Sequence, residues 1–395
     1  MRRVRLKEIG TFYSGLSGKS KSDFSEGNAL LVTYRNIFNN PVLNPAIKDT
    51  VVVGKDEKQN EVLWGDILIT GSSETPADAG MSSVVLFNPQ EKMYLNSFCF
   101  GFRLNDMNEA LPSYIGHLLR STSIRAAISK TAFGVTRFNV NRMRFADIEI
   151  PLPPLNIQKE IVSILDSFTS LIDKMKQEAE MRKKQMDYYR EKLFSFGKEE
   201  CEWRTLNELF TFKNGINKEK NDFGRGTPII NYVDVYRKRG LVKEDIKGLV
   251  NSNASEQSRY KCKKGDVFFT RTSETKEEVG FPAVLLEDIE NCVFSGFVLK
   301  ATPTTDLLDT HYCKYCFFTY QFRKEVIKSA TYTTRALTNG NSLSKISIPV
   351  PSLEKQRQIA SILDTFETYI SKLEKMIELR QKQYEYYREK LLTFE

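Results

Sequence analysis

The side chains that most often carry catalysis are scarce in this sequence. Its 395 residues include only two histidines, His117 and His311, which argues against catalysis by histidine and against a His-rich metal site. Six cysteines occur without the features of a secreted chain, so we interpret them as reduced thiols rather than as a disulfide framework. The polar residues of the loops are therefore candidates for binding rather than for catalysis.

Two short motifs imitate catalytic or ligand-binding sites. Residues 15–20, GLSGKS, look like a phosphate-binding loop, but that pattern requires a glycine at the position of Tyr13. Asp266 with residues 274–276 imitates a metal-dependent nuclease site, yet the matching segment of the first half has Pro76 in place of the lysine. The sequence also contains no glycine-rich methyl-donor loop after a strand and no N-P-P-[YF] string. None of these short motifs therefore supports a nucleotide-binding, nuclease or methyltransferase site.

A tandem repeat organises the whole sequence. Residues 150–196 align without a gap to residues 348–394, and 24 of the 47 positions are identical, which chance does not produce. The longer segments before them match more faintly, for example in the Ser-Glu-Thr triplets at 73–75 and 273–275. Each half is thus predicted to be one globular unit followed by one helix.

The repeat divides the chain into two globular and two helical segments: 1–150, 151–199, 200–348 and 349–395. In the globular segments, short β-rich runs are broken by Gly, Asn and Pro and alternate with helical stretches near Ser113–Ser129 and Thr310–Lys328. This pattern predicts the α+β class, a mixed α/β fold. The net charge of +8 lies mainly in the two globular segments, which suits two modules that face nucleic acid, although charge alone is weak support.

Both helical segments carry a heptad pattern. From Ile161 to Leu193, and again from Ile359 to Leu391, seam residues step by four and three positions in alternation, which is typical of a left-handed coiled coil. Arg182 and Arg380 interrupt the seam at equivalent points and are expected to fix its register. Because the ends of a compact domain are often close together, the second helix is predicted to run back along the first. The result is an antiparallel pair in a pseudo-two-fold tandem repeat, and a homodimerising coiled coil unrelated to DNA is the alternative.

The chain resembles the specificity subunit of type I restriction-modification systems. The resemblance is carried by two variable α/β units, each closed by an I-P-x-P-x-L-x-x-Q-x-x-I-x-x-I-L-D segment that leads into a long helix, at Ile150–Phe168 and Ile348–Phe366. In that family each globular unit is a target-recognition domain that reads one half of a split DNA sequence. The helices set the gap between the halves and bind two methyltransferase subunits.

The resemblance implies partners, and it implies that the chemistry belongs to them. The expected partners are double-stranded DNA, two methyltransferase subunits and, in the full complex, motor-nuclease subunits, with no membrane and a cytoplasmic location. This chain is expected to be a non-catalytic subunit without a cofactor, while the partner subunits use S-adenosylmethionine, ATP and magnesium. A related system with a fused methyltransferase-nuclease partner fits the same architecture, and a coiled-coil scaffold that binds no DNA is a rival from another class.

Polar loops are the candidate DNA contacts. Base identity is read at groove edges by polar side chains, whereas cations on phosphates mainly position the protein. The candidates for base reading or groove contact are Ser72, Ser73, Thr75, Thr136, Arg137, Asn139, Asn141 and Arg142 in the first half, and Arg271, Ser273, Thr275, Thr334, Arg335, Asn339 and Asn341 in the second. The candidates for phosphate contact are Lys19, Lys21, Lys218 and Lys220. Residues that both halves share have an alternative role as scaffold or phosphate contacts, because residues that read different bases should differ.

Overall fold

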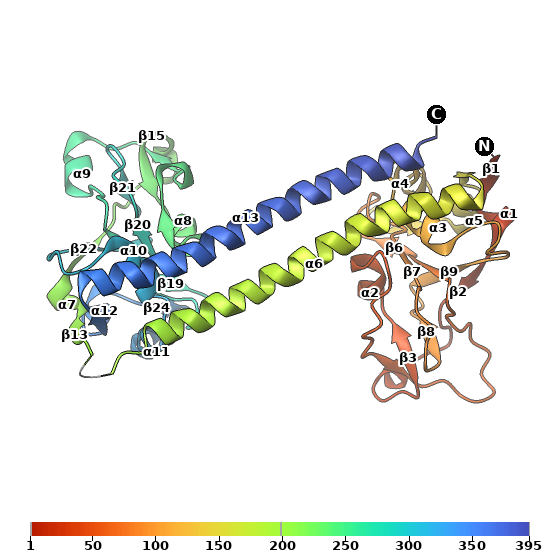
Figure 1. The fold of residues 1–395 in the computed structure, drawn as a ribbon, viewed down its shortest axis with the longest axis horizontal. Coiled ribbons are helices and arrows are strands. Elements are labelled where there is room, and N and C mark those ends of the chain that lie inside the picture. Colours follow the sequence, from red (N-terminus) through yellow and green to blue (C-terminus); the bar gives the residue numbers. More distant parts are fainter. Residues whose placement is uncertain (1, 198–199, 395) are drawn as a thin grey trace. The chain divides into compact units, whose positions relative to one another are not determined.

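The chain forms two compact units. The structure, a computed structural model, describes residues 2–197 and 200–394 (Figure 1). One unit comprises Met1–Lys176 with Lys375–Glu395, and the other comprises Gln177–Glu374. Each unit therefore holds one globular domain, a part of its own long helix and a part of the other one. The four-segment division of the sequence stays a prediction, and Met1, Lys198, Glu199 and Glu395, which it includes, lie outside the described residues.

The first unit is built from short strands and short helices around one four-stranded sheet, with smaller sheets of two or three strands beside it. Its strands are β1 (Arg2–Arg5), β2 (Gly10–Ser14), β3 (Ala29–Val32), β4 (Thr50–Val51), β5 (Ile67–Thr70), β6 (Ser72–Ser73), β7 (Ser82–Val84), β8 (Met93–Leu95), β9 (Cys99–Leu104), β10 (Ala132–Phe133), β11 (Phe138–Val140) and β12 (Glu149–Leu152). Its helices are α1 (Leu6–Ile9), η1 (Lys21–Phe24), α2 (Tyr34–Asn39), α3 (Pro112–Leu119), α4 (Thr122–Ser129) and α5 (Arg142–Ala146). The long helix α6 (Leu155–Leu193) begins here.

The second unit follows a closely related element order. Its strands are β13 (Glu202–Thr205), β14 (Phe210–Asn214), β15 (Phe223–Ile230), β16 (Gly240–Leu241), β17 (Leu249–Val250), β18 (Val267–Thr270), β19 (Thr272–Ser273), β20 (Pro282–Leu285), β21 (Val293–Phe294), β22 (Val298–Pro303), β23 (Thr331–Tyr332), β24 (Ala336–Leu337) and β25 (Ser347–Val350). Its helices are α7 (Leu206–Leu209), η2 (Lys220–Asp222), α8 (Tyr232–Arg237), η3 (Lys243–Asp245), α9 (Ala254–Arg259), α10 (Thr310–Cys316), α11 (Tyr320–Ser329) and α12 (Gly340–Leu343). The long helix α13 (Leu353–Leu392) begins in this unit.

The same sheet lies at the centre of both units. Its strand order is β2-β9-β5-β7 in the first unit and β14-β22-β18-β20-β16 in the second, where β16 adds a parallel edge strand. In each unit the strand that closes the domain pairs with the strand that opens it, β1 with β12 and β13 with β25. The predicted class, an α+β fold with mixed helix and sheet, is confirmed.

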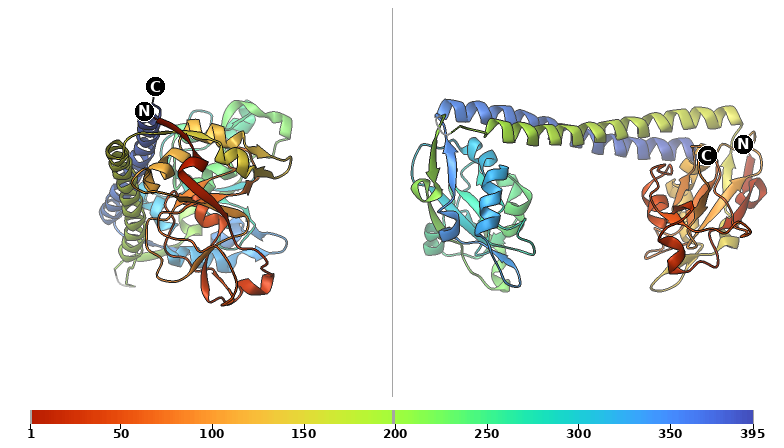
Figure 2. Two further views of the ribbon diagram at one scale, coloured as in Figure 1. Left: turned by 90° about the vertical axis from the view of Figure 1, so that its right-hand side faces the viewer. Right: turned by 90° about the horizontal axis from the view of Figure 1, so that it is seen from below.

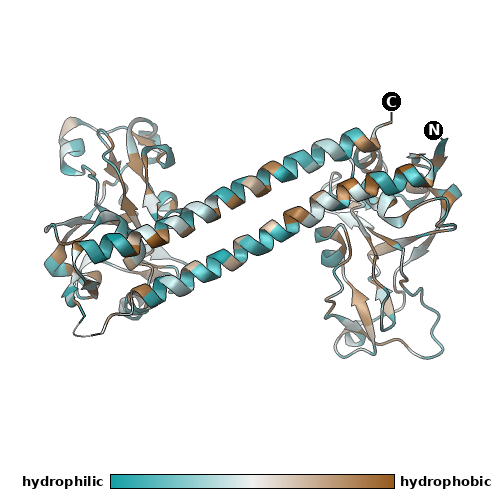
Figure 3. Cartoon of the chain, in the orientation of Figure 1, coloured by the Kyte–Doolittle hydropathy of each residue, from teal (hydrophilic) through white to brown (hydrophobic). Residues whose placement is uncertain are grey.

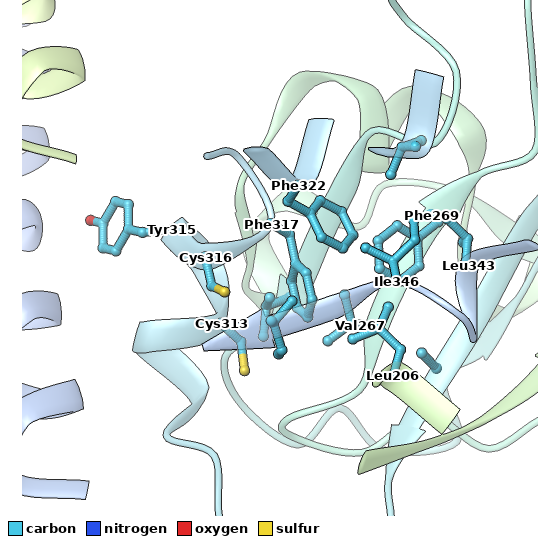
Figure 4. Packing of buried hydrophobic residues seen from close by; sticks show 14 of the residues in the cluster. Leu206, Val267, Phe269, Cys313, Tyr315, Cys316, Phe317, Phe322, Leu343 and Ile346 are labelled. Atoms are coloured by element: carbon cyan, nitrogen blue, oxygen red, sulfur yellow. The ribbon is translucent and has the colours of Figure 1, made fainter. Parts of the chain in front are cut away.

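The central strands are buried on both faces, which explains their continuous apolar sequences. In β5, Ile67 and Ile69 belong to one core cluster and Leu68 to another, as the two-residue period of a strand requires. In β18, Val267 and Phe269 lie in the core that also contains α10 and α11 residues (Figure 4), while Phe268 faces a separate cluster. A strand covered on both sides reads as an apolar run rather than as an alternation.

Each predicted helical stretch before the long helices is in fact two helices. The stretch Ser113–Ser129 is divided between α3 and α4, and Thr310–Lys328 between α10 and α11. The break in the second stretch follows from Thr319, whose side chain accepts a hydrogen bond from the backbone N–H of Phe322 and so caps α11. A capping hydroxyl starts a new helix where apolar periodicity alone predicts continuation.

The two long helices pair in an antiparallel direction, as predicted. Every seam position from Ile161 to Leu193 and from Ile359 to Leu391 is buried or half-buried, and apolar residues recur along both helices between hydrophilic ones (Figure 3). In the first unit Phe168 stacks on Tyr387 of the end of α13, with ring centres 5.5 Å apart. In the second unit the repeat-equivalent pair, Tyr189 and Phe366, stacks at the same distance. Within each unit the helices lie side by side in both views (Figure 2).

The interrupting arginines keep polar partners beside the seam. Arg182 donates to Gln185 over 2.9 Å, and its guanidinium lies 5.5 Å from the ring centre of Tyr369 on α13. Arg380 donates to Gln383 over 2.6 Å. Both guanidinium groups are therefore held at half-buried positions by hydrogen bonds, which is consistent with a role in fixing register.

The repeated I-P-x-P segment joins each domain to its helix through one glutamine. Gln158 is fully buried, donates to the carbonyls of Glu109 and Pro153, and accepts from the backbone N–H of Leu111. Gln356 makes the same three bonds in the second unit, to Leu307, Pro351 and Asp309. One amide therefore satisfies three buried backbone groups, which explains why this residue type stands at both repeat positions.

The far ends of the long helices hold the domains as well. The Glu389 carboxylate on α13 accepts from the backbone N–H of Thr122, at the start of α4, over 2.9 Å. The Glu191 carboxylate on α6 accepts from the backbone N–H of Tyr320, at the start of α11, over 2.9 Å. A carboxylate at a helix N-terminus is stabilising. Each domain is thus bound by the beginning of one long helix and by the end of the other.

The buried glutamine makes a direct prediction about stability. Gln356→Leu should lower the free energy of unfolding of the second unit by about 3 kcal/mol, because three buried backbone groups lose their partner. Trp64 and Trp203 are the two tryptophans of the chain, one in each unit. In a Trp64→Phe background, Trp203 fluorescence during urea titration therefore reports on the second unit. The matched control is Gln358→Leu at an exposed position of the same helix; equal midpoints for the two variants would contradict the prediction.

Candidate nucleic-acid interface

The structure brings together sequence candidates that lie about sixty residues apart. In the first unit β11 pairs with β6, so that Asn139 lies opposite Ser72 and Phe138 opposite Ser73. The hairpin β10–β11 projects beyond this pairing, and Thr136 and Arg137 lie exposed at its tip. The predicted loops of the first half therefore form one surface.

The second unit repeats this arrangement. Its hairpin β23–β24 pairs with β19, so that Thr272 lies opposite Leu337 and Ser273 opposite Ala336. The tip of this hairpin carries Thr334 and Arg335, both exposed. A short two-stranded ribbon with polar residues at its tip is a form that fits the major groove of DNA.

The arginines of the two hairpin tips have different partners. The Nε of Arg137 donates to the Ser72 hydroxyl over 3.0 Å. Arg335 instead pairs with the Glu274 carboxylate at 3.1 Å, and both side chains are largely exposed to solvent, so this ion pair is weak. Both guanidinium groups remain accessible from outside, which leaves them as candidates for phosphate or base contacts.

Three predicted serines do not reach the surface. Ser72, Ser73 and Ser273 are 4%, 8% and 6% exposed. The Ser72 hydroxyl accepts from Arg137, and the Ser273 hydroxyl donates to the Glu278 carboxylate. The hydroxyls of Ser72 and Ser273 thus bond within the fold, which supports the scaffold role weighed as the alternative, and DNA contact by the three serines stays a prediction.

Among the neighbouring threonine and asparagine candidates, some lie in exposed turns and others cap helices. Thr75 is exposed but donates to Asp78 over 2.6 Å, and Thr275 lies in the corresponding exposed turn. The side-chain oxygens of Asn141 and Asn339 accept from backbone N–H groups and cap α5 and α12. Asn capping is a local structural role. The side-chain oxygens of these two asparagines are thus occupied within the fold.

Four further candidates lie at exposed or half-buried positions in the two units. Asn139 and Asn341 are exposed. Arg142, also exposed, donates to the Ser14 hydroxyl over 2.8 Å. Arg271 donates to the carbonyl of Gly296 over 2.9 Å and is half-buried. These residues remain predictions for DNA contact.

Two of the four predicted phosphate-binding lysines have internal partners. The side chains of Lys19 and Lys218 are only 9% and 17% exposed, and each ammonium group pairs with a carboxylate, Glu57 and Glu256 respectively. Hydrogen bonds from Lys19, from Gln59 and from the backbone of Gly54 together lower the pKa of Glu57 to about 2. The charges of these two lysines are thus paired within the protein, which favours an internal role for them, and their phosphate contact stays a prediction. Lys21 and Lys220 are exposed and keep that prediction.

One pair of supporting residues was missed in the sequence. Arg125 on α4 donates to the carbonyls of Ala77, Ala79 and Gly80, the loop that follows β6. Arg323 on α11 makes the same three bonds to residues 277, 279 and 280, and burial lowers its pKa to about 10. The sequence contains a signal for this pair, because the two arginines are separated by the same 198 positions as the repeated helices. The hydrogen bonds of these two arginines hold the loops that lie beside each hairpin.

The Asp266 that imitates a nuclease site is an internal ion-pair residue. It is 1% exposed and accepts from the Lys300 ammonium at 3.1 Å. In the described residues, 2–197 and 200–394, no group of three or more His, Cys, Asp and Glu side chains is placed to hold a metal ion. The candidate groups that are exposed around the hairpins are hydrogen-bonding and charged side chains.

The fold and this surface define a class of protein: a tandem repeat of domains with polar hairpin surfaces, each carried on a long paired helix. Comparison with known families agrees. The model of the type I restriction modification DNA specificity domain matches residues 1–181 and 198–381. The chain belongs to this family.

The chain is also similar to individual specificity subunits in sequence and to solved structures in fold. The chain is 30% identical over 266 residues to the EcoR124I/EcoR124II specificity subunit of Escherichia coli, a match that spans 62% of this chain and 63% of that relative. A putative type I specificity subunit of Haemophilus influenzae is 31% identical, over 66% of this chain and 68% of its own length. The crystal structure of the M. genitalium S subunit has a TM-score of 0.55 at 15% identity, covering 100% of this chain and 96% of that one. A structure described as addressing complex assembly of the type I R-M system reaches 0.65 at 15% identity, covering 99% and 97%.

Proposed function

We propose that this chain is the DNA-specificity subunit of a type I restriction-modification complex and recognises a bipartite site in double-stranded DNA. One observation carries the proposal: the two units present equivalent hairpin surfaces on the same scaffold but with different side chains. Asn139 faces Ser72 in the first unit, where the second unit has Leu337 facing Thr272. An amide and an isobutyl group at matched positions select different base edges. Each domain therefore reads its own half-site.

Two methyltransferase subunits are proposed to dock on the long helices. Tyr188 on α6 and Tyr386 on α13 occupy equivalent repeat positions and are both 61% exposed. Ile164 and Ile362 are likewise equivalent, at 42% and 43%. Exposed aromatic and aliphatic groups are typical of the central part of protein interfaces. Two matching sets of them support two copies of one partner.

The catalytic groups are proposed to lie in the partners. In this proposal the methyltransferase subunits use S-adenosylmethionine, motor-nuclease subunits use ATP and magnesium, and the whole complex is cytoplasmic. Across residues 2–197 and 200–394, no helix combines the length and apolar character that crossing a bilayer requires. A system with a fused methyltransferase-nuclease partner would use this chain in the same way.

The test is the methylome of cells that express the chain with its methyltransferase partner. We expect a methylated motif made of two short defined halves separated by a fixed number of unspecified bases. Cells that express the methyltransferase alone are the control and should lack this motif. A continuous short motif, or no motif that depends on this chain, would overturn the proposal.

A further inference from the structure

A phenylalanine ring protrudes from the same turn in both units. Phe98 lies between β8 and β9 and is 59% exposed, and Phe297 lies between β21 and β22 and is 67% exposed. The strand registers make the positions equivalent, because Thr70 pairs with the residue after Phe98 and Thr270 with the residue after Phe297. An apolar ring is thus kept in solvent at a matched position while the residues around it differ.

The backbone of each turn is held firmly although the ring is not buried. The N–H of Phe98 donates to the Asn96 side chain over 2.9 Å, and its carbonyl accepts from the N–H of Gly71 over 2.8 Å. In the second unit the N–H of Phe297 donates to Ser295 over 3.3 Å, and its carbonyl accepts from the N–H of Arg271 over 3.3 Å. The ring is therefore presented on a fixed support, which reduces the entropy lost when it binds.

The surroundings of each ring are cationic. The Arg137 guanidinium lies 5.4 Å from the ring centre of Phe98. Arg271 adjoins the turn of Phe297, because its guanidinium donates to the carbonyl of Gly296 over 2.9 Å. Gly71 and Arg271 directly precede β6 and β19, so both turns border the hairpin surfaces. A neutral ring beside arginines complements a polyanion whose interior is apolar, which describes a DNA duplex with its stacked bases.

We propose, building on the function proposed above, that Phe98 and Phe297 are the apolar base contacts of the two recognition domains. Each ring enters the groove beside its hairpin and packs on a base, while the neighbouring arginine contacts a phosphate or a base edge. A phenyl ring neither donates nor accepts a strong hydrogen bond, so its partner is a base face, a base step or a thymine methyl group. Each ring serves one half-site only.

The experiment measures binding of duplexes by the full chain in complex with its methyltransferase subunits. One probe carries the methylated motif, and another has the first half-site scrambled. Phe98→Ala should weaken binding to the motif by roughly 10- to 100-fold. Binding to the scrambled probe and the salt dependence of binding should stay unchanged, because a neutral ring releases no counterions. In the methylome, only the first half of the motif should become less strictly defined.

Control variants separate this role from a structural one. Phe98→Leu keeps an apolar side chain on the turn and should retain more of the affinity, and Phe297→Ala should relax only the second half-site. Melting temperatures of all variants should equal that of the parent protein. The proposal is overturned if Phe98→Ala binds the motif as the parent does, if both probes are weakened equally, or if the loss accompanies unfolding. Failure of the parent complex to prefer its motif would instead refute the proposed function itself.

Discussion

Exchange of the first globular domain for that of a relative with a different target should change one half of the methylated motif and leave the other half and the gap unchanged. The two domains have separate hydrophobic cores, one around Phe100 and Phe102 and one around Phe269 and Phe317. β1 pairs with β12 over four residue pairs, from Arg2 with Leu152 to Arg5 with Glu149. The junction of the exchanged domain therefore belongs after β12, at residue 154, and not within this strand at residue 150. A junction inside β12 would join two unrelated halves of one strand pair.

The exchange is expected to succeed because much of the domain-to-helix contact uses backbone atoms of the domain. Gln158 bonds the backbone of Glu109, Leu111 and Pro153, and Glu389 bonds the backbone N–H of Thr122. A backbone group is available whatever side chain the residue carries. The two domains are therefore free to differ in sequence while the helical segments that hold them share 24 of 47 positions. Under the proposed function, this combination would let one scaffold carry domains with different targets.

Methylome sequencing of cells that carry the exchanged chain measures the outcome. The reciprocal exchange of residues 200–351, which end before α13, is the matched control and should alter only the other half of the motif. A change in both halves would show that the domains do not read independently. A chain that no longer supports any methylation while remaining folded would indicate that the exchanged domain also contacts the methyltransferase.

The long helices and the class of fold were predictable from sequence because they depend on short-range periodicity. A heptad needs only the residues on one helix, and 24 identities in 47 positions make the repeat plain. The fate of single candidate residues was not predictable in this way. Lys19 is neutralised by Glu57, 38 positions away, and Ser72 is covered by a hairpin about 65 positions away. No local pattern reports which distant partner the fold will supply.

Differences between the two cores that compensate one another were equally unpredictable from the sequence. Asp66 is buried and accepts from the Tyr13 hydroxyl at 2.7 Å, and a side chain at Gly101 would collide with the Tyr13 ring. At the positions that match Tyr13 and Gly101 in the strand register, the second unit has Lys213 and Lys300. In the first unit the Arg103 guanidinium pairs with Asp66 at 2.7 Å, and in the second unit Lys300 pairs with Asp266 at 3.1 Å, so the two units neutralise the same buried charge with a cation from a different position. Such a pair is recognisable only once the strands are aligned in space.

Shortening both long helices by one heptad should shorten the gap of the methylated motif. Deletion of residues 173–179 and 371–377 preserves the seam, because Ile172 is then followed three positions later by the residue that was Arg182, and the second helix behaves likewise. Seven residues correspond to about 10.5 Å of helix. Since a base pair rises about 3.4 Å along the duplex, the gap should decrease by at most about three base pairs.

The measurement is again the methylome, read for the number of unspecified bases between the halves. Both half-sites should stay as they are, because the deleted residues belong to neither globular domain. A full-length variant with Asp173→Ala and Lys174→Ala, two exposed positions of the deleted segment, is the control for altered composition and should keep the original gap. A shortened chain that still methylates the motif with the original gap would show that helix length does not set the spacing, and the proposed role of the paired helices would then have to be limited to docking partner subunits.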